Sequence, residues 1–315
     1  GFLDNAGKFS RFFEMAQVQR EGEPEVIEQS AVVARLFEKD LKLISNSREN
    51  SVIFFSEEGT STLYGYRYFD NIRERKLAAW FRWTLTGTIQ YHCMQDDNLY
   101  VVVRNNNKDQ LLKYAIKMDS NTFALAENRV HLDHLMSTSG WSYNATTDKS
   151  TKAKPTGLES SNQLVAYITA TAVGQGLEGV GRYGKITING SNMELDGNWA
   201  NETVLVGYQF TMQVDLPTIY YVTREGDQFR ADTRSSLVLH RAKFGFGPIG
   251  LYETTLNRTG RVAYTELFEL TGADQYSAST QSTVNDNVIR EVPIFDANTN
   301  VALTIKSTHP APATI

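Results

Sequence analysis

The sequence predicts an all-β protein: part of a β-propeller built from antiparallel meander blades, followed by a β-sandwich or barrel-like domain, with one short helix. Short alternating runs of apolar and polar residues recur about every ten residues between turn-forming residues. The chain also holds 15 Tyr and 16 Phe, residue types that favour strands and interface contacts. No stretch alternates strands with long amphipathic helices, so a doubly wound parallel sheet is not expected.

The clearest strand pattern runs from Ser45 to Val103 and consists of four alternating runs, each closed by turn-forming residues. Within Ala79–Leu85, a two-residue period separates the side chains into two faces. The expected core face holds Ala79, Phe81, Trp83 and Leu85. The other face, which is expected to be partly exposed to solvent, holds Trp80, Arg82 and Thr84. Hairpin turns are expected at Glu58-Gly59 and Asp96-Asp97-Asn98, because Gly, Asn and Asp tolerate positive φ angles. This unit has about the size of one propeller blade.

The short helix is predicted at Glu25–Asp40, where Pro24 suits the first turn and apolar residues stand near helical spacing. These apolar residues are Val26, Val33, Leu36 and Phe37. Further strands are predicted at 110–118 and 124–132, and we assign residues 1–136 to the propeller-like portion. Residues 137–162 are rich in Ser, Thr, Asn, Lys and Gly, which predicts a linker or a long exposed loop.

Strand patterns resume after this segment, and we assign residues 163–315 to the sandwich or barrel-like portion. The predicted strands are 164–173, 184–188, 203–214, 218–223, 235–242, 250–256, 261–270 and 288–294. Short strands at such regular spacing are typical of sandwiches and barrels.

Charge and cysteine content exclude several classes of protein. The net charge of −5 and the pI near 5.6 argue against a sequence-independent nucleic-acid binder, which would show a basic stripe. A mildly acidic chain can still line a channel in which DNA slides without sticking. The single cysteine, Cys93, excludes an intrachain disulfide framework and a multi-cysteine metal site, and we predict a core residue there. No apolar run approaches the ~20 residues that a membrane-spanning helix needs.

A glycine-rich motif, GQGLEG at Gly174–Gly179, matches the dinucleotide-binding fingerprint and follows a predicted strand. The fingerprint also needs a helix N-terminus to hold the pyrophosphate, whereas residues 182–188 predict another strand. We therefore interpret the motif as a flexible turn. Contact of this loop with a neighbouring subunit or with a channel stays open as an alternative.

Three further groups of residues resemble chemical sites. His131, Asp133 and His134 offer metal ligands, but strand geometry would send the two histidines to opposite faces, which favours ordinary polar or core residues. The pairs Glu57-Glu58 and Asp96-Asp97 suit hairpin turns better than acid–base catalysis. Basic residues interleave with an aromatic one at Arg67, Arg73, Arg75, Lys76, Trp80 and Arg82. For these we predict structural pairing ahead of DNA contact, because Asp70 and Glu74 dilute the charge.

Two clusters of short motifs carry a resemblance to a known family. The first comprises RFFEMA at Arg11–Ala16, ISNSRENSVIFF at Ile44–Phe55, YGYRYFD at Tyr64–Asp70 and AWFRW at Ala79–Trp83. The second comprises VGYQF at Val206–Phe210, LPTIYY at Leu216–Tyr221, ADTRSSLVLHR at Ala231–Arg241 and LTIKSTHPAPATI at Leu303–Ile315. The chain thus resembles the tail tubular protein B family, the tail nozzle proteins of short-tailed bacteriophages of the podovirus and autographivirus type. Likeness is weakest at 137–164 and 173–201. Because such proteins are usually far longer, we expect the chain to be a piece of the C-terminal half.

The resemblance implies a virion structural protein of the phage tail. It implies a hexameric ring whose central channel passes DNA during ejection without sequence-specific binding. The implied partners are the tail adaptor protein (tail tubular protein A), a tail fibre protein that the nozzle helps to anchor, and the host cell surface. A ring subunit needs no catalytic constellation, so we expect no enzyme and no cofactor, and assign no catalytic, cofactor-binding or metal residues.

Two other functions stay open from the sequence. A phage-tail enzyme that degrades host polysaccharide would need carboxylates and aromatic side chains that converge in one cleft, yet the common hydrolase motifs are missing. A non-enzymatic receptor-binding or glycan-binding β protein would instead show an exposed aromatic platform. Neither alternative explains a likeness that runs along the whole chain.

Overall fold

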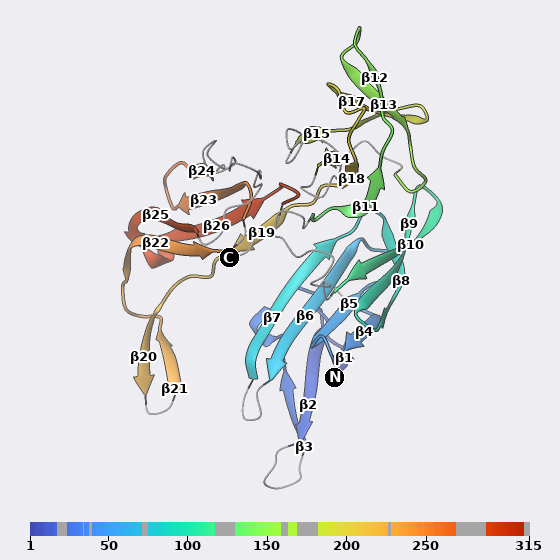
Figure 1. The fold of residues 1–315 in the computed structure, drawn as a ribbon. Coiled ribbons are helices and arrows are strands. Elements are labelled where there is room, and N and C mark those ends of the chain that lie inside the picture. Colours follow the sequence, from blue (N-terminus) through green and yellow to red (C-terminus); the bar gives the residue numbers. More distant parts are fainter. Residues whose placement is uncertain are drawn as a thin grey trace. The chain divides into compact units, whose positions relative to one another are not determined.

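The structure is a computed structural model, and Figure 1 shows its ribbon. It describes residues 1–17, 24–33, 35–37, 40–70, 75–116, 130–158, 163–168, 182–225, 228–247, 249–268 and 288–311. The chain forms two compact units, Gly1–Asp119 and Ser120–Ile315. Regular structure in the described residues consists of antiparallel strands and short 3-10 turns, which confirms the all-β prediction. Among these residues, no helix is long and apolar enough to cross a membrane.

The first unit consists of three successive antiparallel meanders, β1-β2-β3, β4-β5-β6-β7 and β8-β9-β10. Their strands are β1 (Phe2–Asp4), β2 (Arg11–Gln17), β3 (Pro24–Glu28), β4 (Leu43–Ser47), β5 (Val52–Ser56), β6 (Thr62–Asp70), β7 (Arg75–Thr84), β8 (Thr88–Gln95), β9 (Asn98–Asn105) and β10 (Lys108–Ala115). The predicted hairpin turns are present, with φ of 82° at Gly59 and 52° at Asp96. The strand pattern at Ser45–Val103 therefore specified real hairpins.

The middle sheet, β4 to β7, buries side chains on both of its faces. In β5, the neighbouring residues Phe54 and Phe55 enter separate cores because successive strand side chains point to opposite faces. In β7, Phe81 and Trp83 pack against the core shared with β8 and β9, as predicted, whereas Trp80 packs against the core shared with β2. The face of β7 that was expected to be partly wet thus contributes Trp80 to a second core.

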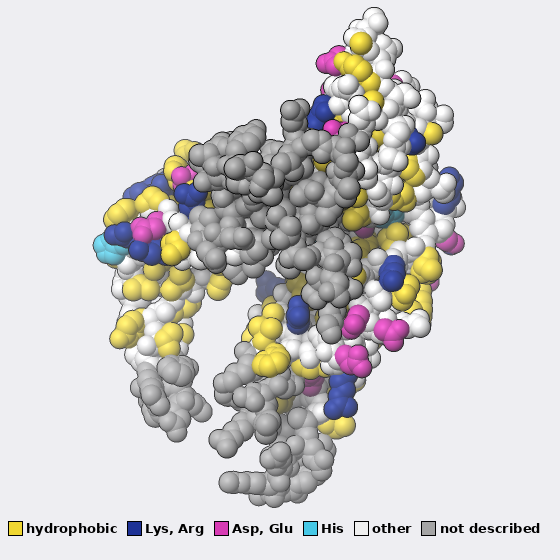
Figure 2. Space-filling model, in the orientation of Figure 1, with side chains coloured by type: hydrophobic (Ala, Val, Ile, Leu, Met, Phe, Trp, Pro, Cys, Tyr) yellow, Lys and Arg dark blue, Asp and Glu magenta, His cyan; other side chains and the backbone are white. Residues whose placement is uncertain are grey.

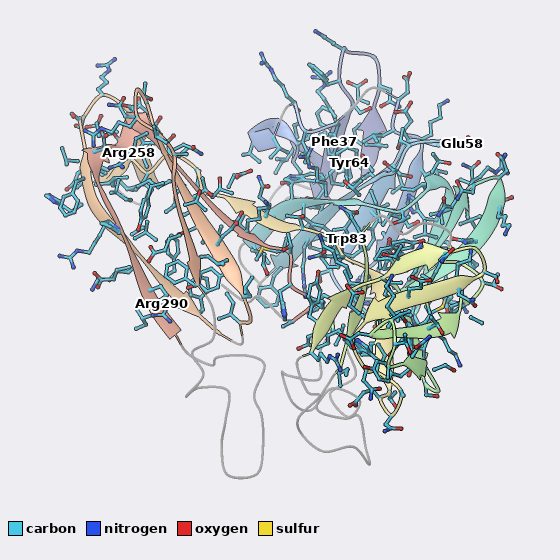
Figure 3. The ribbon with its side chains drawn as sticks, turned by 90° about the horizontal axis from the view of Figure 1, so that it is seen from above. Phe37, Glu58, Tyr64, Trp83, Arg258 and Arg290 are labelled. Atoms are coloured by element: carbon cyan, nitrogen blue, oxygen red, sulfur yellow. The ribbon has the colours of Figure 1, made fainter. Side chains whose placement is uncertain are left out.

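The core on the β2 side is built largely from aromatic rings. Phe12 contacts Phe55 at 4.9 Å between ring centroids, and Phe37 contacts Tyr64 edge-on at 5.3 Å. Figure 3 shows Phe37 and Tyr64 beside each other in this core. Edge-to-face geometry of this kind adds attraction beyond the burial of area. The outer sheet β1-β2-β3 is therefore attached to the middle sheet by aromatic packing.

The first strands of the second and third meanders, β4 and β8, are joined by a buried polar contact. The Ser45 hydroxyl donates to the His92 carbonyl oxygen at 3.0 Å and lies 2.5 Å from His92 Nδ1. Burial of the imidazole lowers the pKa of His92 to about 4, because a charged ring would lose its hydration. His92 is therefore neutral at pH 7.

The predicted helix at Glu25–Asp40 is wrong. Its first part is strand β3, which pairs with β2, and a 3-10 turn at Ala31–Val33 follows. Ser30 lies in the turn after the strand, and its hydroxyl accepts a hydrogen bond from the Phe12 backbone N–H at 3.0 Å. An isolated helix of this length is only marginally stable in water. Pairing with β2 therefore stabilises this segment, with its β-branched residues, more than a helix would.

The second unit contains the remaining strands. They are β11 (Asp133–Thr138), β12 (Ser142–Asn144), β13 (Lys149–Ala153), β14 (Leu164–Tyr167), β15 (Tyr183–Lys185), β16 (Thr187–Asn189), β17 (Asn192–Asp196), β18 (Val204–Tyr208), β19 (Met212–Asp215), β20 (Tyr221–Glu225), β21 (Gln228–Asp232), β22 (Val238–Phe246), β23 (Tyr252–Arg258), β24 (Tyr264–Phe268), β25 (Val288–Ala297) and β26 (Val301–Ser307). Four-stranded sheets form in the orders β11-β18-β14-β15, β12-β13-β17-β16 and β19-β26-β23-β24. The pairs β22-β25 and β20-β21 form two-stranded sheets.

Two strands, β12 and β13, lie in the segment 137–162 that was expected to be a linker or exposed loop. β13 pairs with β17 along five residues, and Ser150 in β13 is fully buried, with its hydroxyl accepting the Trp199 N–H at 2.8 Å. This segment is therefore part of a sheet. The predicted boundary after residue 136 falls inside β11, which pairs with β18 in the second unit. The division of roles between the two portions stays a prediction.

Two cores stabilise the second unit. One surrounds Trp199 and joins the two sheets that contain β18 and β17. The other lies between the sheet β19-β26-β23-β24 and the pair β22-β25, with Phe246, Tyr252 and Ile305 at its centre. The predicted strand at 124–132 and the distal part of 164–173 fall mainly outside the described residues.

Candidate functional site

His131, Asp133 and His134, which resemble a metal site in sequence, do not converge in the structure. Asp133 begins β11, and its Oδ2 lies 4.0 Å from Nε2 of the buried His134, whose ring packs edge-on against Tyr208 at 5.3 Å. His131 lies at a shallow pocket that His309 also lines. In the described part of the chain, no group of three or more His, Cys, Asp and Glu side chains is placed to hold a metal ion. His134 is thus a core histidine beside a tyrosine.

The acidic pairs lie in turns. Glu57 and Glu58 precede Gly59 in the β5–β6 turn, and Figure 3 shows Glu58 at the periphery. Asp97 accepts a hydrogen bond from Asn50 Nδ2 at 2.9 Å, which ties the β8–β9 turn to the β4–β5 turn. Both acidic pairs therefore belong to hairpin turns. Cys93 is a free, half-buried thiol in β8.

Among the interleaved basic and aromatic residues, Trp80 has a structural role. Trp80 donates from Nε1 to the Gln29 carbonyl oxygen at 3.0 Å, and its ring lies 4.4 Å from that of Tyr66. Arg67 and Arg82 are exposed. Arg73 and the side chains of Arg75 and Lys76 lie outside the described residues, as does the motif at 174–179. Trp80 is therefore a core residue.

Exposed apolar side chains gather instead on the two outer sheets of the first unit. On β1-β2-β3, Phe2 pairs with Phe13 and their rings stack at 5.4 Å, while Met15 pairs with Val26. Phe2, Met15 and Val26 are exposed. We call Phe2, Phe13, Met15 and Val26 the β1–β3 outer face. Arg11, which is paired with Asp4 at 2.5 Å, borders it.

The opposite end of the stack carries a similar surface. The register places Tyr91, Val102 and Leu111 in one row across β8, β9 and β10, and Tyr91 and Leu111 are exposed. We call this row the β8–β10 outer face. Because the two outer sheets pack on opposite faces of the middle sheet, these two surfaces point away from each other. Contiguous exposed apolar surface is typical of protein–protein interaction sites.

A third feature is the ribbon β20-β21, which Figure 1 shows standing away from the sheets of the second unit. Tyr221 and Val222 are 59% and 51% exposed, and Figure 2 shows hydrophobic side chains at the surface of the described part of the ribbon. Asn298, which is buried, holds both roots of the ribbon. Its Nδ2 donates to the Ile219 carbonyl oxygen at 2.7 Å, and its backbone N–H donates to the Leu237 carbonyl oxygen at 2.8 Å.

A fourth feature is the segment after β26, Thr308–Ala311, which we call the C-terminal strap. His309 packs between Tyr167 and Tyr183 at ring distances of 5.6 and 5.7 Å, and its Nδ1 accepts the Ala311 N–H at 3.2 Å. Gln209 Nε2 donates to the Thr308 carbonyl oxygen. Burial lowers the pKa of His309 to about 4. The strap thereby connects the end of β26 to the sheet that contains β14 and β15.

Comparison with known proteins decides the family. The sequence model of the bacteriophage nozzle protein family matches residues 1–315, the whole chain. The chain belongs to the bacteriophage nozzle protein family. No curated protein matches it. As a member of this family it is a structural component of the virion tail.

The most informative residues of this nozzle-family chain carry no recognisable chemical motif. Asn298 lies in an ordinary loop sequence, DANTN, and only its two hydrogen bonds show its role. His309 lies within the closing motif LTIKSTHPAPATI, which carried part of the family likeness. That motif was the one available signal, and the strap gives it a structural explanation.

Replacing Asn298 with Ala is expected to loosen the ribbon at its root. The Ile219 carbonyl oxygen would lose its buried donor, at a cost of about 1–3 kcal/mol. Hydrogen exchange should therefore accelerate at residues 219–223, while the first unit stays unchanged. The matched control is Asn300→Ala, because Asn300 is exposed and its Nδ2 lies 3.4 Å from Asp296 Oδ1. Equal exchange in both variants would contradict the role of Asn298.

Proposed function

We propose that the protein is a subunit of the ring-shaped tail nozzle, and that the ring surrounds the channel through which DNA leaves the virion. The observation that carries this proposal is the nozzle-family match over the whole chain. The apolar surfaces on opposite ends of the first unit support it, because a ring subunit must contact a neighbour on each side with two different surfaces.

The first unit supplies part of a β-propeller in this proposal. Three meanders that follow one another in sequence and pack face to face match the way in which propeller blades are arranged. The contact between β4 and β8 fits as well, since each is the first strand of its meander. The two outer faces would then be those on which further blades or neighbouring subunits pack. The second unit supplies the β-sandwich-like nozzle or platform portion.

The remaining details follow from family resemblance. The ring is proposed to be hexameric, to contact the tail adaptor protein, to help anchor tail fibres and to meet the host cell surface. DNA passes through it without sequence-specific contacts, which the net charge of −5 supports. We do not propose an enzyme, because the acidic pairs that would have suggested glycoside hydrolysis shape turns.

Electron microscopy of the natural protein, with symmetry analysis and its mass in solution, tests the proposal. Rings with six-fold symmetry and a central hole are the expected result. A protein that stays monomeric, even when mixed with its tail adaptor, would overturn the nozzle assignment. Sugar release from host polysaccharide would then be the next measurement.

A further inference from the structure

The ribbon β20-β21 is a two-stranded sheet of its own, and its described side chains Tyr221 and Val222 are exposed. Five residue pairs, from Tyr221–Asp232 to Glu225–Gln228, join its strands. Among the described strands, β20 and β21 pair only with each other. An isolated two-stranded ribbon is at best marginally stable in water, and burial of its apolar residues against another surface is what stabilises it. Tyr221 and Val222 are adjacent, so they present apolar surface on both faces of the ribbon.

Hydrogen bonds at both ends of the ribbon fix its direction. Asn298 binds the chain on both sides of it, at Ile219 and Leu237. After β21, the Asp232 carboxylate accepts the Arg234 and Ser235 backbone N–H groups at 2.9 and 3.2 Å, which orders the return path. Anchoring of this kind restricts the orientation of the ribbon, which a flexible loop would not require. The two anchored ends are consistent with an arm, β20-β21, that contacts a partner in one orientation.

An open strand edge lies across the same layer. In the order β19-β26-β23-β24, the arm leaves the chain just after β19 at one edge, and β24 forms the other edge. Within the described residues, β24 pairs only with β23. Natural edge strands are usually protected by Lys, Pro or a bulge. β24 reads YTELF, which contains no Lys, Pro or bulge, and Glu266 is its one charged residue. Its Tyr264 and Leu267 are exposed, and Val262 before it is 90% exposed.

We propose that the free edge of the β20-β21 arm pairs with the β24 edge of a neighbouring copy of this chain. The arm strands and β24 each contain five residues, so one added strand would match the edge along its length. Main-chain hydrogen bonds would supply affinity, and Tyr221 and Val222 would cover Tyr264 and Leu267. Because the arm leaves the chain after the edge strand β19, and β24 forms the other edge of the same sheet, each copy gives an arm and receives one. Such head-to-tail contact gives a ring where the rotation between copies closes, as the proposed nozzle requires.

This inference rests on the proposed ring, and site-specific cross-linking tests it separately. The natural protein would carry Cys93→Ser, and Ser at any further cysteine, together with Val222→Cys and Leu267→Cys. A short bis-maleimide reagent should then give a ladder of covalent multimers. A mixture of Val222→Cys protein and Leu267→Cys protein should give covalent dimers, which only contact between copies can produce. Thr187→Cys in β16, an exposed position away from β24, replaces Leu267→Cys as the control and should leave monomers.

Hydrogen exchange gives a second readout on the unmodified protein. Amides of the arm should exchange at least about tenfold more slowly in assembled rings than in monomers, because pairing protects them. Rings that form without the covalent ladder and without protection of the arm would overturn the arm proposal and leave the nozzle proposal standing. Absence of any ring would instead count against the nozzle proposal itself. The two failures are therefore distinguishable.

Discussion

Acidification from about pH 7 to about pH 4 is expected to remove up to about 3 kcal/mol from the free energy of unfolding of the second unit. The cause is His309, whose pKa falls from 6.5 to about 4 on burial. In the folded protein the ring stays neutral, whereas the unfolded chain binds a proton below pH 6.5. The stabilising contribution is therefore complete above pH 6.5 and is lost as the pH falls toward about 4.

The geometry of the strap explains why protonation is unfavourable there. Nδ1 of His309 accepts the Ala311 N–H, so a proton on that nitrogen would break the bond. The charged ring would also lie between Tyr167 and Tyr183, where burial deprives it of water. Burial likewise raises the pKa of Tyr183, which keeps its hydroxyl neutral beside the ring. Acid should thus release the strap before it unfolds the rest of the sheet.

Thermal unfolding as a function of pH checks this prediction. His309→Gln should flatten the pH dependence of the second unit between pH 6.5 and about 4. His92→Gln is the matched control, because His92 has a similarly lowered pKa but lies in the first unit. His92→Gln should flatten the pH dependence of the stability of the first unit alone. If the second unit keeps its full pH dependence in His309→Gln, His309 is not the group responsible.

Phe12→Ala is expected to destabilise the first unit by about 3–5 kcal/mol, the usual cost of truncating a buried phenylalanine to alanine. Phe12 is 1% exposed and contacts the rings of Phe55, Tyr66 and Trp80 at 4.9, 5.7 and 6.0 Å. These rings attach β1-β2-β3 to the middle sheet. The variant should therefore lose protection in the outer sheet first, followed by cooperative unfolding of the unit. Denaturant titration with hydrogen exchange would measure both effects.

Phe2→Ala is the control for this prediction. Phe2 belongs to the same outer sheet but is 45% exposed, and its main contact is the Phe13 ring. Its truncation should change the stability of the monomer by less than about 1 kcal/mol. It should weaken assembly if the β1–β3 outer face is an interface. A loss of monomer stability as large as that of Phe12→Ala would show that our account of the aromatic core is wrong.

The sequence predicted strands well where turn chemistry was explicit. Asp96-Asp97-Asn98 and Glu58-Gly59 marked hairpins that the structure contains, because positive φ angles suit those residue types. The segment Glu25–Asp40 misled because its apolar spacing fits a helix nearly as well as a strand. Pairing with β2 decided between the two, and such tertiary pairing is invisible in a single sequence. β12 and β13 were missed because their mostly polar sequences lack the alternation of apolar and polar residues that predicts a strand.

Candidate surfaces were harder to predict than strands. Alternation in β7 showed that two faces exist, but the sequence could not show that both would be buried, with Trp80 in a second core. Likewise, nothing in Tyr91, Val102 and Leu111 predicts that they form one row, because the register of three strands decides it. The motif at His131–His134 had the right residue types without the converging geometry.

The successive meanders of the first unit affect the order in which the two units fold during synthesis. Each strand of β4 to β10 pairs with a strand adjacent in sequence, so its contacts are local. The second unit must instead join distant segments, as in the hydrogen bond between Thr304 and Asp215, which lie 89 residues apart. Chains with local contacts fold faster, because little loop entropy opposes them. We therefore expect the first unit to fold while the ribosome is still translating the second, and the second unit to be completed only once β26 has been made.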